Sequence, residues 1–164
     1  MNVRSIRKLY AYNRWANDRT LSSVSDLNTD EFTRKFAVSF GSVQGTLAHI
    51  LGVEWLYLRR WRGTFPTALP EGEEEFPDVA HLRSYWQSVL SDQANFLDNL
   101  TEERLLQGLT YVNMSGQKYT YPLADIMQHL VNHSTYHRGQ VVSLLRMLNK
   151  KPLATDYLLY LDES

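Results

Sequence analysis

Three histidines recur at four-residue intervals in the segment His129–Gln140, which otherwise has the pattern of a helix. They are His129, His133 and His137. Residues four apart on a helix lie on the same face, roughly 6 Å apart, so two such imidazoles can bind one metal ion. A fourth histidine, His49, lies far upstream in another helix-like segment and could supply a third ligand.

The apolar pattern indicates which two of the three histidines face inward. Residues 123–148 carry a stripe with alternating steps of four and three residues, as expected for the core face of a bundle helix: Ile126, Leu130, His133, His137, Gln140, Leu144 and Met147. A register through His129 collects too many polar residues for a core face. We therefore predict that His133 and His137 form the ligand pair and that His129 is a flanking residue.

Polar packing is the alternative interpretation of these histidines. A single core histidine is usually hydrogen-bonded to its neighbours and binds no metal. Two stacked histidines followed by Gln140 are costly to bury without partners, which favours a ligand. The residues alone leave the metal site and the polar core about equally supported.

The composition of the chain limits the classes of function that the protein can have. Its 164 residues fit one domain, residues 1–164, and 43% of them are hydrophobic. Seventeen basic residues against eighteen acidic ones, with no basic run, argue against nucleic acid as a partner. The chain has no cysteine, which excludes a thiolate nucleophile and fits a cytoplasmic protein. We expect no signal peptide and no membrane-spanning segment.

Four long helical segments are predicted, which indicates an all-α four-helix bundle with metal ligands on inward faces. They cover about residues 2–24, 42–62, 79–99 and 123–148. The periodicity assigns Ile50 and Val53 to the inner stripe of the second helix and Tyr85 to that of the third.

The connecting segments carry weaker patterns. Residues 109–121 contain two β-prone runs around Ser115-Gly116, which predicts a small β-hairpin before the last long helix, with Pro122 as that helix's first residue. The acidic tract 71–75 is predicted to be a solvated surface loop. The apolar tail 157–161 is expected to dock against the body.

Several motifs together resemble the DinB family, part of the wider DinB/YfiT-like superfamily of metalloenzymes. The similarity spans nearly the whole chain, and its element His137-Arg138-Gly139-Gln140 is quite specific. The matching stretches are Tyr12–Asn17, Ser42–Ile50, Trp55–Arg59, Asn132–Gln140 and Pro152–Leu161.

The resemblance implies a four-helix bundle in up-down-down-up order, with a divalent metal held by His49, His133 and His137. Zinc and nickel suit such ligands best. It also implies a homodimer and a link to damage-inducible genes, from which the family takes its name. The superfamily includes enzymes that transfer low-molecular-weight thiols such as bacillithiol or mycothiol, and a mycothiol-dependent isomerase.

Three functional hypotheses follow. In the first, the ion activates water or a thiol for attack on a small electrophile, as in a hydrolase or a thiol S-transferase. Because the chain has no cysteine, any thiol would be a cosubstrate. The second is a non-catalytic metal-binding stress-response module, and the third is a plain helical dimer with histidines in its core.

Other residues are weaker candidates for the pocket or for supporting contacts. Gln140 could hydrogen-bond a histidine ligand, or bridge polar groups in the packing. Asn13 and Asn17 could line the pocket or bond backbone at a helix contact, and Tyr136 could donate a proton or pack. Arg138 is expected to pair with an acidic residue at the dimer contact. No carboxylate has a spacing that nominates it as a general base.

Overall fold

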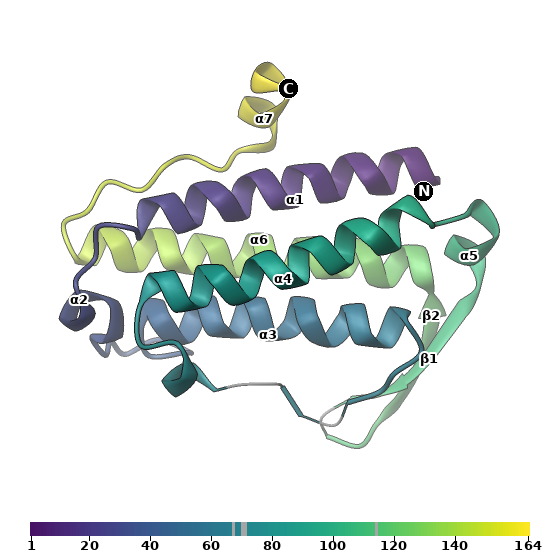
Figure 1. Cartoon of the computed structure of the whole chain (residues 1–164), viewed down its shortest axis with the longest axis horizontal. Coiled ribbons are helices and arrows are strands. Elements are labelled where there is room, and N and C mark those ends of the chain that lie inside the picture. Colours follow the sequence, from purple (N-terminus) through teal and green to yellow (C-terminus); the bar gives the residue numbers. More distant parts are fainter. Residues whose placement is uncertain (67, 70–71, 114) are drawn as a thin grey trace.

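The computed structural model describes residues 1–66, 68, 69, 72–113 and 115–164. Four long helices of the described residues form the body: α1 (Val3–Ser23), α3 (Val43–Trp61), α4 (Val79–Asp98) and α6 (Leu123–Met147). The chain runs one way along α1, returns along α3, repeats the direction of α3 along α4, and returns along α6 (Figure 1). The predicted four-helix bundle and its up-down-down-up order are confirmed.

Side-chain caps explain why these helices begin where they do. The side chains of Asn2, Ser42 and Asp78 each accept a hydrogen bond from the backbone N–H three residues on, at the start of α1, α3 and α4. The predicted helix ends agree with the structure to within one or two residues. Pro122 is a correction, because it is the N-cap of α6 and Leu123 is the first helical residue.

The predicted β-hairpin is present between α4 and α6. Strands β1 (Gly108–Val112) and β2 (Lys118–Pro122) pair antiparallel, with Tyr111 opposite Tyr119. Gly116 has a φ of 82°, which a glycine adopts without steric cost, so the Ser115-Gly116 turn signal was informative.

Short helices complete the connections: α2 (Thr29–Thr33), η1 (Glu73–Glu75), α5 (Glu102–Leu106) and α7 (Tyr157–Glu163). Part of the acidic tract thus forms a short 3-10 helix in which Glu74 and Glu75 are exposed, while Glu71 lies outside the described residues. Within the described part of the chain, no helix is long and apolar enough to cross a membrane.

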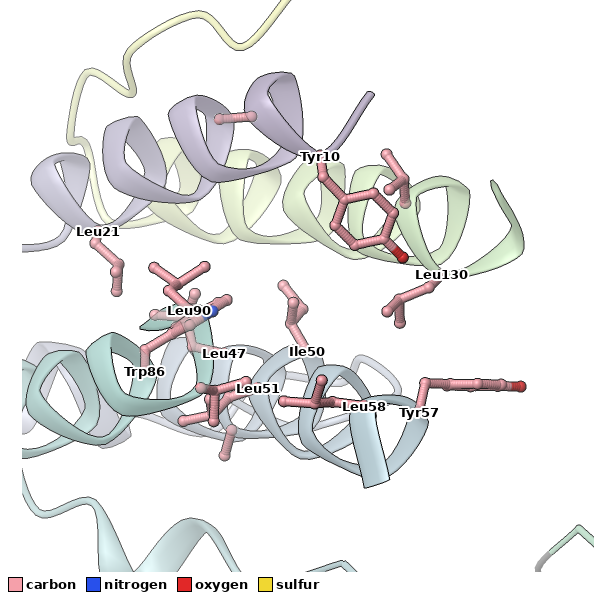
Figure 2. Packing of buried hydrophobic residues seen from close by; sticks show 14 of the residues in the cluster. Tyr10, Leu21, Leu47, Ile50, Leu51, Tyr57, Leu58, Trp86, Leu90 and Leu130 are labelled. Atoms are coloured by element: carbon pink, nitrogen blue, oxygen red, sulfur yellow. The ribbon is translucent and has the colours of Figure 1, made fainter. Parts of the chain in front are cut away.

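The hydrophobic core lies between the four long helices and includes Trp86 from α4 and Leu47, Ile50 and Leu51 from α3 (Figure 2). Two stripe predictions are wrong in detail. On α4 the fully buried aromatic is Trp86 rather than its neighbour Tyr85. On α6 Met147 is 57% exposed, because the inward face at this end of the helix runs through Leu144, Leu145 and Leu148 instead.

The tail docks on the outer face of α1 (Figure 1). The Tyr12 ring lies edge-on to Tyr157 and Tyr160, at centroid distances of 5.0 and 5.8 Å. The Trp15 Nε1–H donates to Glu163 at 3.0 Å. No residue of α7 is buried, so the predicted docking is a contact through aromatic edges rather than entry into the core.

Candidate metal centre

His49, His133 and His137 come together where α3 packs against α6. His49 Nε2 lies 3.0 Å from His133 Nε2, and one ring nitrogen from each of the three lies within 4.8 Å of the others. We call these three residues the histidine cluster. His129 is exposed, with its ring centroid 6.3 Å from that of His133, and is outside this cluster.

Burial keeps two of these imidazoles neutral near pH 7. Desolvation, followed by the electrostatic effect of the neighbouring His137, lowers the pKa of His49 to about 4. The same causes in the same order lower the pKa of His133 to about 3, with His49 and His129 adding to the effect. A neutral imidazole is the form that binds a metal ion, so the surroundings favour the ligand state.

Gln140 fixes the orientation and tautomer of His137. His137 Nδ1 lies 2.8 Å from Gln140 Oε1, and an amide oxygen only accepts, so Nδ1–H is the donor. This leaves the Nε2 lone pair of His137 free to face a ligand. Gln140 therefore accepts a hydrogen bond from a candidate metal ligand, which is one of the two roles that the sequence suggested for it.

The Nδ1 atom of His133 differs from that of His137, because no hydrogen bond within the described part of the chain holds it. This nitrogen is nevertheless buried. An unpaired buried polar atom costs free energy, and a bound water or ion is one way in which proteins satisfy such an atom.

Phe40 covers one side of the cluster. Its ring stacks on His49 at a centroid distance of 4.0 Å and an interplanar angle of 17°, and it meets His137 edge-on at 5.2 Å. A cavity of about 530 Å³ opens beside it, lined by Phe40, His49, Ala48 and Gly45 among others. Sequence reasoning missed Phe40, because it lies in an irregular segment where no periodicity points a side chain inward.

Tyr136 lies at the surface beside the cluster. Its side chain is 67% exposed, and its ring meets that of His137 edge-on at 4.9 Å. The structure thus places Tyr136 against the outer edge of a cluster residue.

Asn13 and Asn17 are paired with Glu54 and Arg138 rather than with a histidine. Both asparagines donate to Glu54 Oε1, at 2.8 and 3.0 Å, and both accept from the Arg138 guanidinium, at 2.7 and 2.8 Å. Ser134 also donates to Glu54 Oε1, and the Trp86 indole donates to Oε2. We call these six residues the Glu54 cluster.

Two sequence expectations change as a result. Arg138 is 1% exposed inside one chain, so it does not face a dimer contact as predicted. Glu54, which is fully buried, was missed altogether. The sequence pattern could have placed Glu54 in the core, because it follows the stripe residue Ile50 by one helical turn. Val53, which was assigned to the stripe, is only half-buried.

The donor set of the histidine cluster fits a divalent transition metal. Imidazole nitrogens bind zinc at about 2.0–2.1 Å, which puts two ligands of a tetrahedral ion about 3.3 Å apart. The nitrogens of His49 and His133 are already close to that spacing, and a small side-chain rotation would bring in the third. All three donors are nitrogen, which suits zinc or nickel better than magnesium or calcium.

Comparison with known proteins is consistent with the architecture. The sequence matches the DinB family over residues 1–164. It is 27% identical over 160 residues to Protein DinB of Bacillus subtilis (strain 168), covering 94% of this chain and 92% of that protein. The fold is similar to the crystal structure of a DinB-like protein from Bacillus cereus ATCC 10987, with a TM-score of 0.64 and 14% identity over 93% of this chain and 97% of that one.

Proposed function

Because this chain belongs to the DinB family and brings three imidazoles together between α3 and α6, we propose that it is a divalent-metal-dependent enzyme. His49, His133 and His137 would hold the ion, with zinc or nickel as the metal. The observation that carries the proposal is the convergence of three ring nitrogens, two of them on imidazoles kept neutral by burial.

The chemistry available to such a site is activation of a nucleophile. An ion with three protein ligands keeps a coordination position for water or substrate, and it lowers the pKa of a water or thiol that binds there. Gln140 holds His137 in the tautomer that presents Nε2. Phe40 excludes water from one face of His49, and the adjacent cavity offers room for a small electrophile.

The proposed reaction is hydrolysis or transfer of a low-molecular-weight thiol to a small molecule. Any thiol has to come as a cosubstrate, since the chain has no cysteine. Among the described residues, no carboxylate makes a hydrogen bond or ion pair with the three cluster histidines, and the buried Glu54 accepts four hydrogen bonds inside the Glu54 cluster. The homodimer and the cytoplasmic location expected from the sequence stay predictions.

A non-catalytic metal-binding module is the second candidate, and one observation favours it. Phe40 stacks on His49 and also touches His137, so it narrows access to the histidine cluster. A structural ion would be expected to resist chelators and to unfold the chain when removed. A catalytic ion would exchange more readily and leave a folded apoprotein.

Metal content measured by plasma mass spectrometry on untagged protein tests the proposal. Wild type would be compared with His49→Ala and His133→Ala, and with His129→Ala as a matched control on the same helix. About one zinc or nickel ion per chain, lost in the first two variants and kept in the control, is the expected result. Wild-type protein that takes up no metal when zinc and nickel are offered would overturn it.

Activity assays then separate the two candidates. The metal-loaded protein would be offered thiols with small electrophiles, and a panel of hydrolase substrates. Turnover that disappears in His49→Ala supports the enzyme. Stoichiometric metal without turnover, together with unfolding on metal removal, supports the structural module.

A further inference from the structure

A second cavity, of about 340 Å³, lies between the hairpin and the outer face of α3 and α6. Four tyrosines line it, Tyr57, Tyr111, Tyr119 and Tyr121, and Asp125 and His129 contribute polar atoms. A cavity of this size with mostly aromatic walls and a few polar groups is typical of a small-molecule site. We call it the tyrosine pocket.

The topology explains why the tyrosines meet. Tyr111 pairs with Tyr119 across the hairpin, and Leu109 pairs with Tyr121, so these side chains share one face of the two strands. Leu109 is buried, which identifies this face as the one turned toward the helices. Asp125 and His129 are one turn apart on α6 and therefore project on the same side.

The Tyr57 ring lies at a steep angle to two other rings of the pocket. Tyr57 and Tyr111 have centroids 6.0 Å apart and planes at 76°, and Tyr57 and His129 are 5.8 Å apart at 61°. The faces of tyrosine rings are electron-rich and attract cations. The protein already uses this property, because the guanidinium of Arg60 lies 4.4 Å from the Tyr111 ring and 5.1 Å from the Tyr57 ring.

The charged group of the pocket lining is negative, as are the electron-rich faces of the rings. Asp125 is an exposed carboxylate, and the described residues that line the pocket include neither lysine nor arginine. Arg60 itself is buried, donates to the backbone oxygen of Val112 and is not among the described residues that line the pocket. Electron-rich rings beside one carboxylate suit a weakly hydrated cation.

We propose that the tyrosine pocket binds an organic cation, an ammonium group on a small apolar body. The rings contact the apolar groups around the nitrogen, and Asp125 supplies the opposite charge. This site goes beyond the proposed metal function and does not depend on a bound ion. It is close to the histidine cluster, since His129, which lines the pocket, has its ring 6.3 Å from that of His133.

Choline and its uncharged carbon analogue, 3,3-dimethylbutan-1-ol, test the charge preference directly because they have nearly the same shape. Binding of each would be followed by NMR titration of metal-free protein and of His49→Ala, which lacks the proposed metal ligand. Choline is expected to bind about tenfold more tightly than the alcohol. The same preference for choline is expected in His49→Ala, so the experiment can support the pocket proposal even when the metal proposal is overturned.

Variants locate the binding. Asp125→Asn and Tyr121→Leu change exposed side chains of the pocket, so they should fold, and each is expected to weaken choline binding about fivefold to tenfold. Thr120→Val is the matched control, because Thr120 is on the other face of the same strand. Equal binding of choline and the alcohol, no choline binding, or binding unchanged in both pocket variants would overturn the proposal.

Discussion

The histidine cluster and the Glu54 cluster use adjacent residues of α6, yet their polar atoms are arranged in different ways. His133 and His137 turn toward His49, while Ser134 and Arg138 bond Glu54 and the asparagines of α1. In the Glu54 cluster, four donors reach the two carboxylate oxygens. In the histidine cluster, three ring nitrogens converge on one point. Each cluster keeps one buried nitrogen without a partner among the described residues, His133 Nδ1 in one and Arg138 Nε in the other.

This difference separates a structural polar core from the proposed binding site. Buried polar groups that satisfy one another fix the packing of helices but leave little free to bind anything else. Three ring nitrogens that converge on one point cannot all be satisfied by one another, even though His49 Nε2 and His133 Nε2 are at hydrogen-bond distance, and a ligand would relieve the remaining cost. Burial alone is therefore a poor guide to function in this bundle, because the more deeply buried of the two clusters is the structural one.

The largest expected effect comes from removing the charge at the centre of the Glu54 cluster. Glu54→Ala leaves the buried Arg138 without its carboxylate and takes the acceptor from Asn13, Asn17 and Ser134. We expect it to lower the free energy of unfolding by about 3–5 kcal/mol, measured by urea denaturation. Glu103→Ala, at an exposed carboxylate, is the control and should change it by less than about 0.5 kcal/mol. Similar values for the two variants would show that the Glu54 cluster is not structural.

A double substitution sharpens the comparison by testing whether Glu54 and Arg138 act as a unit. They do not touch directly but share Asn13 and Asn17. Glu54→Leu with Arg138→Met should be less destabilising than the sum of the two single changes, by about 1–3 kcal/mol. Simple additivity in denaturation curves of the four proteins would mean that the asparagines do not couple them.

In the histidine cluster, the matching test targets a supporting contact. Gln140→Leu removes the acceptor of His137 Nδ1–H and is expected to weaken metal affinity about 10- to 100-fold. The free energy of unfolding of the metal-free protein should hardly change in this variant, whereas Glu54→Ala is expected to lower it. Ser143→Ala, on an exposed position of the same helix, serves as the control in a competition titration with a chelator of known affinity. Unchanged affinity in Gln140→Leu would assign that contact to packing alone.

A further test of the histidine cluster is the dependence of stability on pH. The pKa values of His49 and His133 are lowered to about 4 and about 3 in the folded chain, against about 6.5 when unfolded. Between pH 7 and pH 5 the unfolded chain therefore binds more protons at these positions, so acidification favours unfolding. Metal-free protein should melt at a lower temperature at pH 5 than at pH 7.

The double variant His49→Ala, His133→Ala is the control for this dependence and should show a smaller decrease in melting temperature over the same range. Carboxylates with ordinary pKa values titrate mainly below this window, so they contribute little to the difference. An identical decrease in wild type and variant would contradict the neutral, buried state of the two imidazoles.

Much of the fold was predictable because its signals are local. Caps at Ser42 and Asp78 and the 3.6-residue periodicity define the long helices, and the Ser115-Gly116 turn defines the hairpin. The two errors in the stripes have a common cause. A periodic pattern gives the direction of a helix face to within one residue, so it cannot choose between Tyr85 and Trp86, or between Met147 and Leu148.

The site was predictable only as far as its residues follow such a pattern. His133, His137 and Gln140 are on one stripe of one helix, and the structure brings them together with His49. Glu54 was missed because a carboxylate on a core stripe was not weighed as core. Asn13 and Arg138 could not be paired from sequence, because their contact depends on how α1 and α6 are rotated against each other.

Sequence separation within the histidine cluster makes it a reporter of folding order. His133 and His137 are brought together as soon as α6 forms, whereas His49 is 84 residues from His133 and joins them only when α3 has docked. Closing so long a loop is among the late and entropically costly events in folding. An ion that requires all three nitrogens therefore binds only chains that have completed this step, and its uptake during refolding would time the docking of the two helices.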